Sequence, residues 1–294
     1  GVRGDRHTWT GQSTLAPRFS ARWDATPRTQ LRAAIGTYAQ AQALHDLAVV
    51  DGDSLFARAE RSLQRIVGVE HAVAGWTLRA EAFERRLREP RERWLSTDGD
   101  LDPFPEGQLD RLRFAPDSGR VRGAEFLASY DRGGRVRATA WYAHMNGTAW
   151  TSFGETPRPF EERHSGAIDL AARQASGWTW ALAWSFHSGW PNVPASFRVD
   201  TLAPGQFAIE RNAPTPTFTE RLDAYQRVDI RVSRRFTLRR GTLSVFAEVF
   251  NLFDRANHSG WSYDAFLNAG RLTVQRTPES FIGRLPTAGF RWEF

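Results

Sequence analysis

Apolar and polar side chains alternate at successive positions through most of this chain. The last residues show the pattern plainly, with Phe290, Trp292 and Phe294 on one face and Arg291 and Glu293 on the other. Successive side chains of a β-strand point to opposite faces of a sheet, so a period of two predicts strands with one apolar and one polar face. No helical period of 3.6 residues persists for three turns, and we therefore expect an all-β fold.

Eleven segments carry this alternation, and each predicts a strand of about ten residues. They lie around residues 17–24, 31–38, 67–70, 78–82, 123–130, 135–142, 168–173, 178–186, 225–236, 243–250 and 290–294. Phe246 and Phe250 depart from strict alternation, because they fall on the polar side of their segment. Ten residues rising about 3.3 Å each, with a tilt of about 40°, span roughly 25 Å, which is the height of the apolar band of an outer-membrane barrel. Strands of soluble sandwiches are usually about five or six residues long, so strand length favours a transmembrane barrel.

Short and long connections alternate between these segments. The short ones hold Gly or Pro where hairpin turns need them, at 26–29, 74–76, 132–134, 176–177 and 239–241. The long ones are rich in Pro, Gly, Asp and Asn, at 40–58, 95–119, 147–163, 189–222 and 254–285. This order is typical of an antiparallel up-and-down β-barrel with short periplasmic turns and long extracellular loops. Because bacterial barrels have an even number of strands, eleven strands predict that residues 1–294 form one domain, a partial barrel whose N-terminal part is missing.

Composition and charge narrow the class of protein. The 294 residues include 39 Arg, no Lys, 33 acidic residues and no Cys, with a formal net charge of +6. The lack of Cys excludes disulfides and thiolate metal sites. The arginines are interspersed with acidic residues along the strands, so no nucleic-acid partner is predicted. The longest uncharged stretch, Ala175 to Phe197, is interrupted by Ser, Gly, His and Pro, and it does not predict a transmembrane helix.

The C-terminal segments resemble a known family. Tyr225–Ser233, Gly289–Phe294 and the segment Phe-Ala-Glu-Val-Phe-Asn-Leu-Phe-Asp at 246–254 are similar to the last three strands of a TonB-dependent outer-membrane receptor. Weaker similarity in the earlier segments extends the resemblance over nearly the whole chain. Members of this family have a barrel of about twenty-two strands with a plug inside. The resemblance therefore implies the C-terminal half of such a barrel, with the plug domain missing.

The resemblance also implies a location, an activity and a set of partners. It implies the cell outer membrane of a Gram-negative bacterium and active uptake of a bulky, scarce nutrient of the siderophore, cobalamin or oligosaccharide class. The partners would be outer-membrane lipid, the nutrient, the missing N-terminal barrel half and plug, and the TonB complex acting through that plug. Phe290, Trp292 and Phe294 resemble the signal that the barrel assembly machinery reads, and an aromatic row there also suits an interfacial girdle.

Candidate site residues follow from the predicted faces and loops. Charged side chains on the polar face are expected to form cross-strand ion pairs in a wet lumen, and these are Glu70, Glu81, Glu125, Asp229, Arg231 and Glu248. Two long loops hold side chains that are suited to stacking on a nutrient or hydrogen-bonding to it, and these are Trp190, Asn192, His258, Trp261 and Tyr263.

The sequence shows no known catalytic or metal-binding motif. The seven His residues lack metal-site spacing, and neither Asp51–Asp53 nor Asp98–Asp102 has the spacing of an EF-hand loop. We therefore predict that the chain is not an enzyme and has no catalytic residue, metal site or cofactor. Three alternatives stay open at this point: an outer-membrane barrel enzyme, a passive porin, and a soluble secreted β-sandwich binding module.

Overall fold

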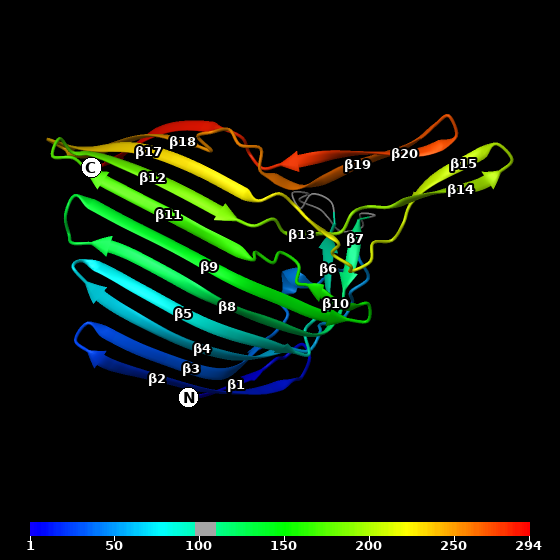
Figure 1. The fold of residues 1–294 in the computed structure, drawn as a ribbon, viewed down its shortest axis with the longest axis horizontal. Helices are drawn as coiled ribbons and strands as arrows, with labels where there is room; N and C mark the ends of the chain where they lie inside the picture. Colours follow the sequence, from blue (N-terminus) through cyan, green and yellow to red (C-terminus); the bar gives the residue numbers. More distant parts are fainter. Residues whose placement is uncertain (98–109) are drawn as a thin grey trace.

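The computed structural model describes residues 1–97 and 110–294, which contain β-strands, connections and one short 3-10 helix at Leu44–Asp46. Twelve strands follow one another in a single antiparallel sheet (Figure 1). Their bounds are β1 Val2–Arg6, β2 Ser13–Thr26, β3 Thr29–Gln40, β4 Glu60–Val73, β5 Trp76–Arg88, β8 Pro116–Asp131, β9 Val136–Thr151, β11 His164–Arg173, β12 Trp178–His187, β17 Tyr225–Leu238, β18 Gly241–Phe250 and β21 Leu285–Glu293. A further short strand, β10 Gly154–Pro157, pairs with β9. Asp98–Asp102 lies outside the described residues.

The predicted all-β antiparallel fold is confirmed, and the large sheet has twelve strands in sequence order together with β10, where about eleven were predicted. The additional strand is β1, which pairs with Ser13–Pro17 of β2. Its sequence, Val-Arg-Gly-Asp-Arg, does not alternate in hydrophobicity, so its place in the sheet depends on backbone pairing that leaves no pattern in the side chains. The argument from an odd number of strands therefore does not hold. β1 and β21 each pair with one neighbour, and the sheet is not closed.

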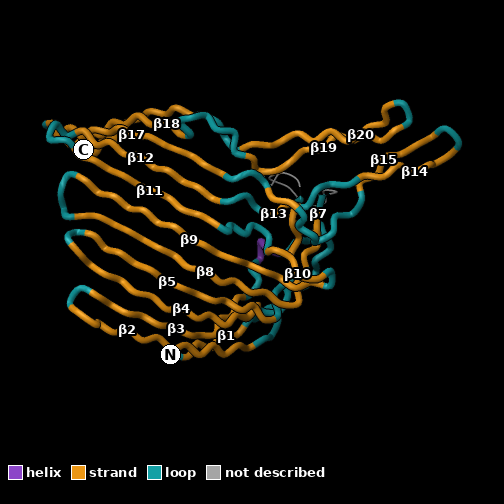
Figure 2. The backbone as a smooth tube through the Cα atoms, viewed as in Figure 1, coloured by secondary structure: helices purple, strands orange, loops and turns teal. Residues whose placement is uncertain are grey.

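Short and long connections alternate as predicted. The short ones are residues 27–28, 74–75, 132–135, 174–177 and 239–240, and they lie together at one end of the sheet, which we call the short-turn end (Figure 2). Gly241 closes the last of these turns with a φ of 99°. A Cβ atom at this position would lie 1.9 Å from the carbonyl oxygen of Glu293, so the turn requires glycine.

The long connections differ from the expected loops, because most of them form strand pairs of their own. β6 Arg93–Ser96 pairs with β7 Arg111–Phe114, β13 Pro191–Asn192 pairs with β16 Glu220–Arg221, β14 Phe197–Ala203 pairs with β15 Gln206–Arg211, and β19 His258–Asn268 pairs with β20 Arg271–Ser280. The β14–β15 and β19–β20 hairpins project beyond the sheet at the end opposite the short turns, which we call the long-connection end (Figure 1). Their Pro and Gly content suggested irregular loops, whereas Gly205 and Gly270 instead close tight hairpin turns at positive φ.

The large sheet has one apolar face and one polar face. Trp180, Leu182 and Trp184 of β12 lie opposite Val232, Ile230 and Val228 of β17, and Trp180 remains 45% exposed. The most buried apolar side chains lie instead among the connections and strand ends at the long-connection end, and they include Leu87, Leu112, Phe114, Val121, Ala149 and Val193. A β-sandwich would bury one face of each sheet against the other, so the single exposed sheet is not consistent with the sandwich alternative. No helix in 1–97 or 110–294 has the length and apolar character needed to cross a bilayer.

Candidate functional site

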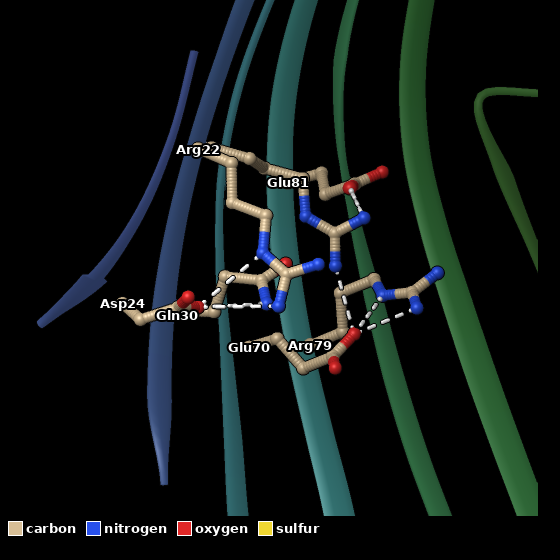
Figure 3. Close-up of polar contacts among 7 residues, drawn as sticks. Arg22, Asp24, Gln30, Glu70, Arg79 and Glu81 are labelled. Atoms are coloured by element: carbon tan, nitrogen blue, oxygen red, sulfur yellow. Dashed lines mark hydrogen bonds and ion pairs between the residues drawn. The ribbon is translucent and has the colours of Figure 1, made fainter. Parts of the chain in front are cut away.

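Charged side chains on the polar face connect strands β3, β4 and β5 (Figure 3). The carboxylate of Glu70 accepts hydrogen bonds from Arg32 Nη2 at 2.8 Å and from Arg79 Nη2 at 2.7 Å. Arg32 also places Nη1 3.4 Å from Glu81 Oε1. Glu70 therefore binds guanidinium groups from both neighbouring strands, whereas Glu81 on β5 pairs with Arg32 on β3, across β4. Ion pairs of this kind stabilise a sheet on its wet face.

Gly68 provides the space for this network. It lies in register between Arg32 of β3 and Glu81 of β5. A Cβ atom at Gly68 would lie 2.8 Å from Glu81 Cγ and 3.3 Å from Arg32 Cγ. The missing side chain thus lets the two neighbouring side chains cross the β4 backbone and meet.

A second set of ion pairs lies on the polar face of β17 and β18. Arg227 Nε donates to Asp229 Oδ2 at 3.0 Å, and Arg231 Nη1 donates to Glu248 Oε2 at 2.8 Å. Five of the six residues predicted to line a lumen are therefore placed in these two sets of ion pairs. The sixth, Glu125, lies opposite Glu81 in the register of β5 and β8, and it has no ion pair within residues 1–97 and 110–294.

Phe246 and Phe250, which broke the sequence alternation, have a clear role in this second set. The guanidinium carbon of Arg231 lies 4.1 Å from the ring centroid of Phe246, and that of Arg227 lies 3.9 Å from the ring centroid of Phe250. The two rings therefore stack on arginines that are already held by carboxylates. Aromatic residues appear on the polar face because their π-faces contact cations there.

An aromatic cluster lies at the long-connection end of β12 and β17. The ring of His187 stacks between those of Trp190 and Tyr225, with centroid distances of 5.1 Å and 4.8 Å and interplanar angles of 13° and 7°. Phe160 and Phe281 meet the Trp190 ring edge-on at 5.5 Å and 6.2 Å. These five rings, which we call the rim aromatic cluster, come from four separate segments of the chain.

A buried ion pair ties the connections together beside this cluster. Glu161, whose side chain is 1% exposed, pairs with Arg221 of β16 and accepts a hydrogen bond from the backbone N–H of Gly147 at 2.7 Å. Arg221 Nη1 also donates to the carbonyl oxygens of Glu161 at 3.1 Å and Gly189 at 3.0 Å. One carboxylate and one guanidinium group therefore hold the β9–β11 connection, the β12–β17 connection and Gly147 of β9 together.

Four of the five predicted ligand-binding residues lie close to one another, and Glu220 and Arg276 join three of them. Asn192 Nδ2 donates to Glu220 Oε1 at 2.8 Å, and Arg276 Nη2 donates to the same oxygen at 2.6 Å. The Arg276 guanidinium carbon lies 3.6 Å from the ring centroid of Trp261 and 5.8 Å from that of Tyr263. We call these five residues the Glu220 cluster.

The other two predicted ligand-binding residues lie beside these clusters. His258 lies against Trp261, with ring centroids 5.8 Å apart, and its Nδ1 is 2.8 Å from Asp223 Oδ2. Trp190 belongs to the rim aromatic cluster, where its Nε1 donates to Glu162 Oε1 at 3.1 Å. Trp261 Nε1 and Tyr263 Oη are buried atoms without a hydrogen-bond partner in the described part of the chain. These two groups are donors that a ligand can satisfy.

Positive charge collects beneath the connections. Arg93 Nη2 donates to the buried carboxylate of Glu60 at 2.7 Å. Burial lowers the pKa of Arg158 from its ordinary value, and the like charges of Arg93 and Arg85 lower it further. Arginine keeps its charge in proteins because its ordinary pKa is so high. Arg158 therefore keeps a positive charge beside two other arginines, and the carboxylate of Glu60 offsets part of that charge.

The predicted assembly signal lies at the short-turn end. Phe290, Trp292 and Phe294 have 74%, 55% and 101% of their surface exposed, and the Trp292 indole donates to the carbonyl oxygen of Arg240 at 3.1 Å. Trp76 and Tyr130 stand near the same end, with ring centroids 5.1 Å apart. Exposed aromatic residues at one end of the strands are typical of an interfacial girdle.

Among residues 1–97 and 110–294, no group of three or more His, Asp and Glu side chains is arranged to hold a metal ion. Asp51 instead pairs with Arg111 at 2.6 Å, and Asp53 Oδ1 lies 3.4 Å from Trp94 Nε1. Both aspartates are therefore held by neighbouring side chains.

Sequence reasoning missed Glu161, Arg221, Glu220 and Arg276, which organise the two clusters. The two residues of each pair are 60 and 56 positions apart in the chain. No local period or motif relates positions at such separations. The only available signal was the presence of charged residues in connections that otherwise resembled polar loops.

Long strands, one apolar face, one polar face and alternating connections define the class of partial transmembrane β-barrels. The family model described as "TonB dependent receptor-like, beta-barrel" matches residues 1–252, and the chain belongs to this family. The family is one of transport receptors in the outer membrane of Gram-negative bacteria. The predictions of family, location and a non-enzymatic role are therefore confirmed. No curated protein sequence matches the chain.

Solved structures show the same fold. The ferric yersiniabactin uptake receptor FyuA from Yersinia pestis matches 96% of this chain at 14% identity with a TM-score of 0.61, and the match spans 38% of its own length. The FrpB iron transporter from Neisseria meningitidis matches 96% at 17% identity with a TM-score of 0.60, spanning 39% of its length. The copper transporter OprC matches 96% at 16% identity with a TM-score of 0.61, spanning 40%. The chain thus spans about two fifths of the length of these receptors.

Proposed function

We propose that residues 1–294 are the C-terminal portion of the barrel of a TonB-dependent receptor for active uptake of a bulky, scarce nutrient. The nutrient belongs to the siderophore, cobalamin or oligosaccharide class. The observation that carries this proposal is the family match over residues 1–252. In this proposal the polar face lines the lumen, where Glu70, Glu81, Glu125, Asp229, Arg231 and Glu248 face a plug. The TonB complex acts through that plug, and the barrel assembly machinery reads Phe290, Trp292 and Phe294.

The chemistry of the long-connection end supports recognition of a large ligand with aromatic or anionic groups. Trp261 and Tyr263 offer ring faces together with buried donors that have no partner in the described part of the chain. Asn192 belongs to the same cluster because it donates to Glu220. Trp190 and His258 extend this surface, so these five residues are the proposed ligand contacts. Arg158 and its neighbours add the positive potential that attracts an anionic chelate. FyuA and OprC, named for yersiniabactin uptake and copper transport, show that receptors of this fold carry metals or metal chelates.

Energised uptake tests the proposal directly. A deletion strain carrying the full-length gene is supplied in turn with radiolabelled ferric siderophores, cobalamin and oligosaccharides, with and without a protonophore. The proposal predicts protonophore-sensitive accumulation of one class. Equal uptake with and without the protonophore would show a passive porin, and uptake of none of the three classes would reject the assigned nutrient range.

Paired variants then test the proposed contacts. Replacing Trp261 and Tyr263 with Ala is expected to raise the half-saturating ligand concentration by about tenfold or more, since stacking and hydrogen bonding are both lost. Leu202→Ala is the matched control, because Leu202 is 69% exposed on the neighbouring β14–β15 hairpin and lies outside the Glu220 cluster. Unchanged uptake in the double variant would remove these two residues from the ligand site while leaving the transport assignment intact.

A further inference from the structure

Six arginines gather on the apolar side of the sheet at the long-connection ends of three neighbouring strands. They are Arg61 and Arg65 of β4, Arg86 and Arg88 of β5, and Arg120 and Arg122 of β8. The register places them in adjacent rows, with Arg61 opposite Arg88 and Arg86 opposite Arg120. We call these six residues the arginine patch.

The arginine patch continues the apolar face of the sheet. Arg65 and Arg122 both lie opposite Glu84 in the sheet. Two residues further toward the short-turn end, the side chains on the same face are Val67, Ala82 and Ala124. The row below that contains Val69, Ala80 and Phe126. Side chains of one parity share one face of a sheet, so the guanidinium groups stand directly above the apolar band, on the side facing away from the ion pairs of the polar face.

Positive charge in the patch is largely uncompensated. The rows that contain the six arginines extend over β3, β4, β5, β8 and β9. On the apolar face of these rows, Glu84 is the only acidic residue. It lies 3.6 Å from Arg65 and 3.1 Å from Arg86, and it also pairs with Arg120. Arg61, Arg88 and Arg122 have no ion pair within residues 1–97 and 110–294. On the polar face, by contrast, Arg32 and Arg79 both bind Glu70.

An apolar groove of about 560 Å³ begins two rows below the patch, at Val69, Ala80 and Phe126, and runs across β4, β5, β8, β9, β11 and β12. Its floor contains Ala128, Ala140 and Gly166, and its walls contain Phe126, Tyr142 and Trp184. A Cβ atom at Gly166 would lie 2.9 Å from the carbonyl oxygen of Trp141, so this position stays open. The groove lies on the apolar face of the sheet, which is the face that meets hydrocarbon chains in the proposed barrel.

We propose that the arginine patch binds the phosphorylated headgroup of an anionic lipid in the outer leaflet, and that its acyl chains lie in the apolar groove. Guanidinium groups form paired, charge-assisted hydrogen bonds with phosphate oxygens. The long connections of outer-membrane barrels are extracellular, so the patch stands at the headgroup level of the outer leaflet. Charge and groove together match a single molecule that is anionic at one end and apolar at the other. The proposal rests on the family and its location, and it does not depend on which nutrient is carried.

The test uses the full-length protein in a nonionic detergent and two lipid probes with the same acyl chains. One is lipid A with its phosphates, and the other is dephosphorylated lipid A. Binding is measured by native mass spectrometry as a titration at two salt concentrations. Phosphorylated lipid is expected to bind more tightly, with affinity that falls as salt rises, because the interaction is between charges.

Variants locate the site. A triple variant is expected to bind the phosphorylated lipid about tenfold or more weakly, because three charge-assisted contacts are lost. It carries Arg61→Gln, Arg88→Gln and Arg122→Gln. The same three positions changed to Lys retain charge and are expected to bind more tightly than the Gln variant. A matched control replaces Arg132, Arg135 and Arg137 with Gln, which removes the same amount of positive charge at the short-turn end of β8 and β9. This control is expected to bind the lipid as tightly as the unmodified protein.

Three results would overturn the proposal. Equal binding of both lipids by the unmodified protein would show that the acyl chains alone determine the affinity for lipid. Displacement of the lipid by equimolar inorganic phosphate would show a site for free phosphate. Binding by the Gln variant at the level of the unmodified protein would place the lipid elsewhere. The first two measurements need no variant, so they decide the matter even where a substituted protein fails to assemble.

Discussion

Replacing Glu161 with Gln is expected to loosen the connections at the long-connection end while leaving the large sheet assembled. The Glu161 side chain is 1% exposed, and it neutralises Arg221, which reaches the carbonyl oxygens of Glu161 and Gly189. Gln has nearly the same shape and still accepts a hydrogen bond from the N–H of Gly147. The substitution therefore removes the one negative charge that faces Arg221 and, at 3.6 Å, Arg163, with little change in shape.

The magnitude follows from burial. Breaking one side of a buried ion pair costs about 3–5 kcal/mol, because the remaining charge stays desolvated. Arg221 is 26% exposed, so water offsets part of this penalty. We therefore expect the lower limit, about 3 kcal/mol, which corresponds to roughly a hundredfold change in an opening equilibrium.

Amide hydrogen exchange measures this opening. The N–H of Leu222 donates to the carbonyl oxygen of Trp190 at 2.9 Å and reports on the connections that Arg221 holds. In the full-length E161Q protein, the Leu222 amide is expected to exchange about a hundredfold faster, while amides of β12 and β17 are unchanged. Glu155→Gln is the matched control, since Glu155 is exposed on β10 and makes no ion pair in the described part of the chain.

Exchange at Leu222 within twofold of the unmodified protein would refute the reasoning. A double variant, E161Q with Arg221→Leu, provides a second check because it removes both charges. If the buried charge causes the loosening, the double variant exchanges more slowly than E161Q alone. Faster exchange in the double variant would show that Arg221 contributes mainly through its other contacts.

Two further substitutions test other parts of the account. Glu70→Gln leaves Arg32 and Arg79 facing each other on the polar face, and we expect the protein to be about 1 kcal/mol less stable, with the difference shrinking at high salt. The temperature at which the folded band is lost in gel electrophoresis measures this, and an unchanged temperature would contradict it. Asn251→Ala removes two hydrogen bonds to the backbone of Arg255 at a position with a φ of 50°, which together are expected to cost about 2–4 kcal/mol locally. Trypsin should then cleave after Arg255 faster than in the unmodified protein, and equal rates would contradict the assigned role.

Local alternation was sufficient to predict most of the large sheet from the sequence. Val228, Ile230 and Val232 share a face in the sequence pattern and in the register of β17. Such strands can be predicted from their own sequence, because every second side chain must be apolar where one face of the sheet meets lipid. β1 was missed for the opposite reason, since Val2–Arg6 is held by backbone pairing with β2 and has no apolar face to recognise.

The candidate site depended on contacts that a single sequence does not specify. The residues of the Glu220 cluster were recognised individually as Asn192, Trp261 and Tyr263, but their organisation depends on Glu220 and Arg276, which come from different strand pairs. Likewise, the rim aromatic cluster brings together four segments whose spacing in the chain is unrelated. Their proximity arises from the order of strands in the sheet, and it is visible only once the sheet is assembled.

The central claim is that successive side chains of the long strands alternate between membrane lipid and the barrel interior. This chain has no Cys, so single cysteines can be placed along β12 from Trp178 to Phe186 without background from residues 1–294. With spin labels in the full-length protein in lipid bilayers, accessibility to oxygen is expected to peak at 178, 180, 182, 184 and 186 and to fall at each position between them. Uniform accessibility, or a period near 3.6 residues, would contradict the claim.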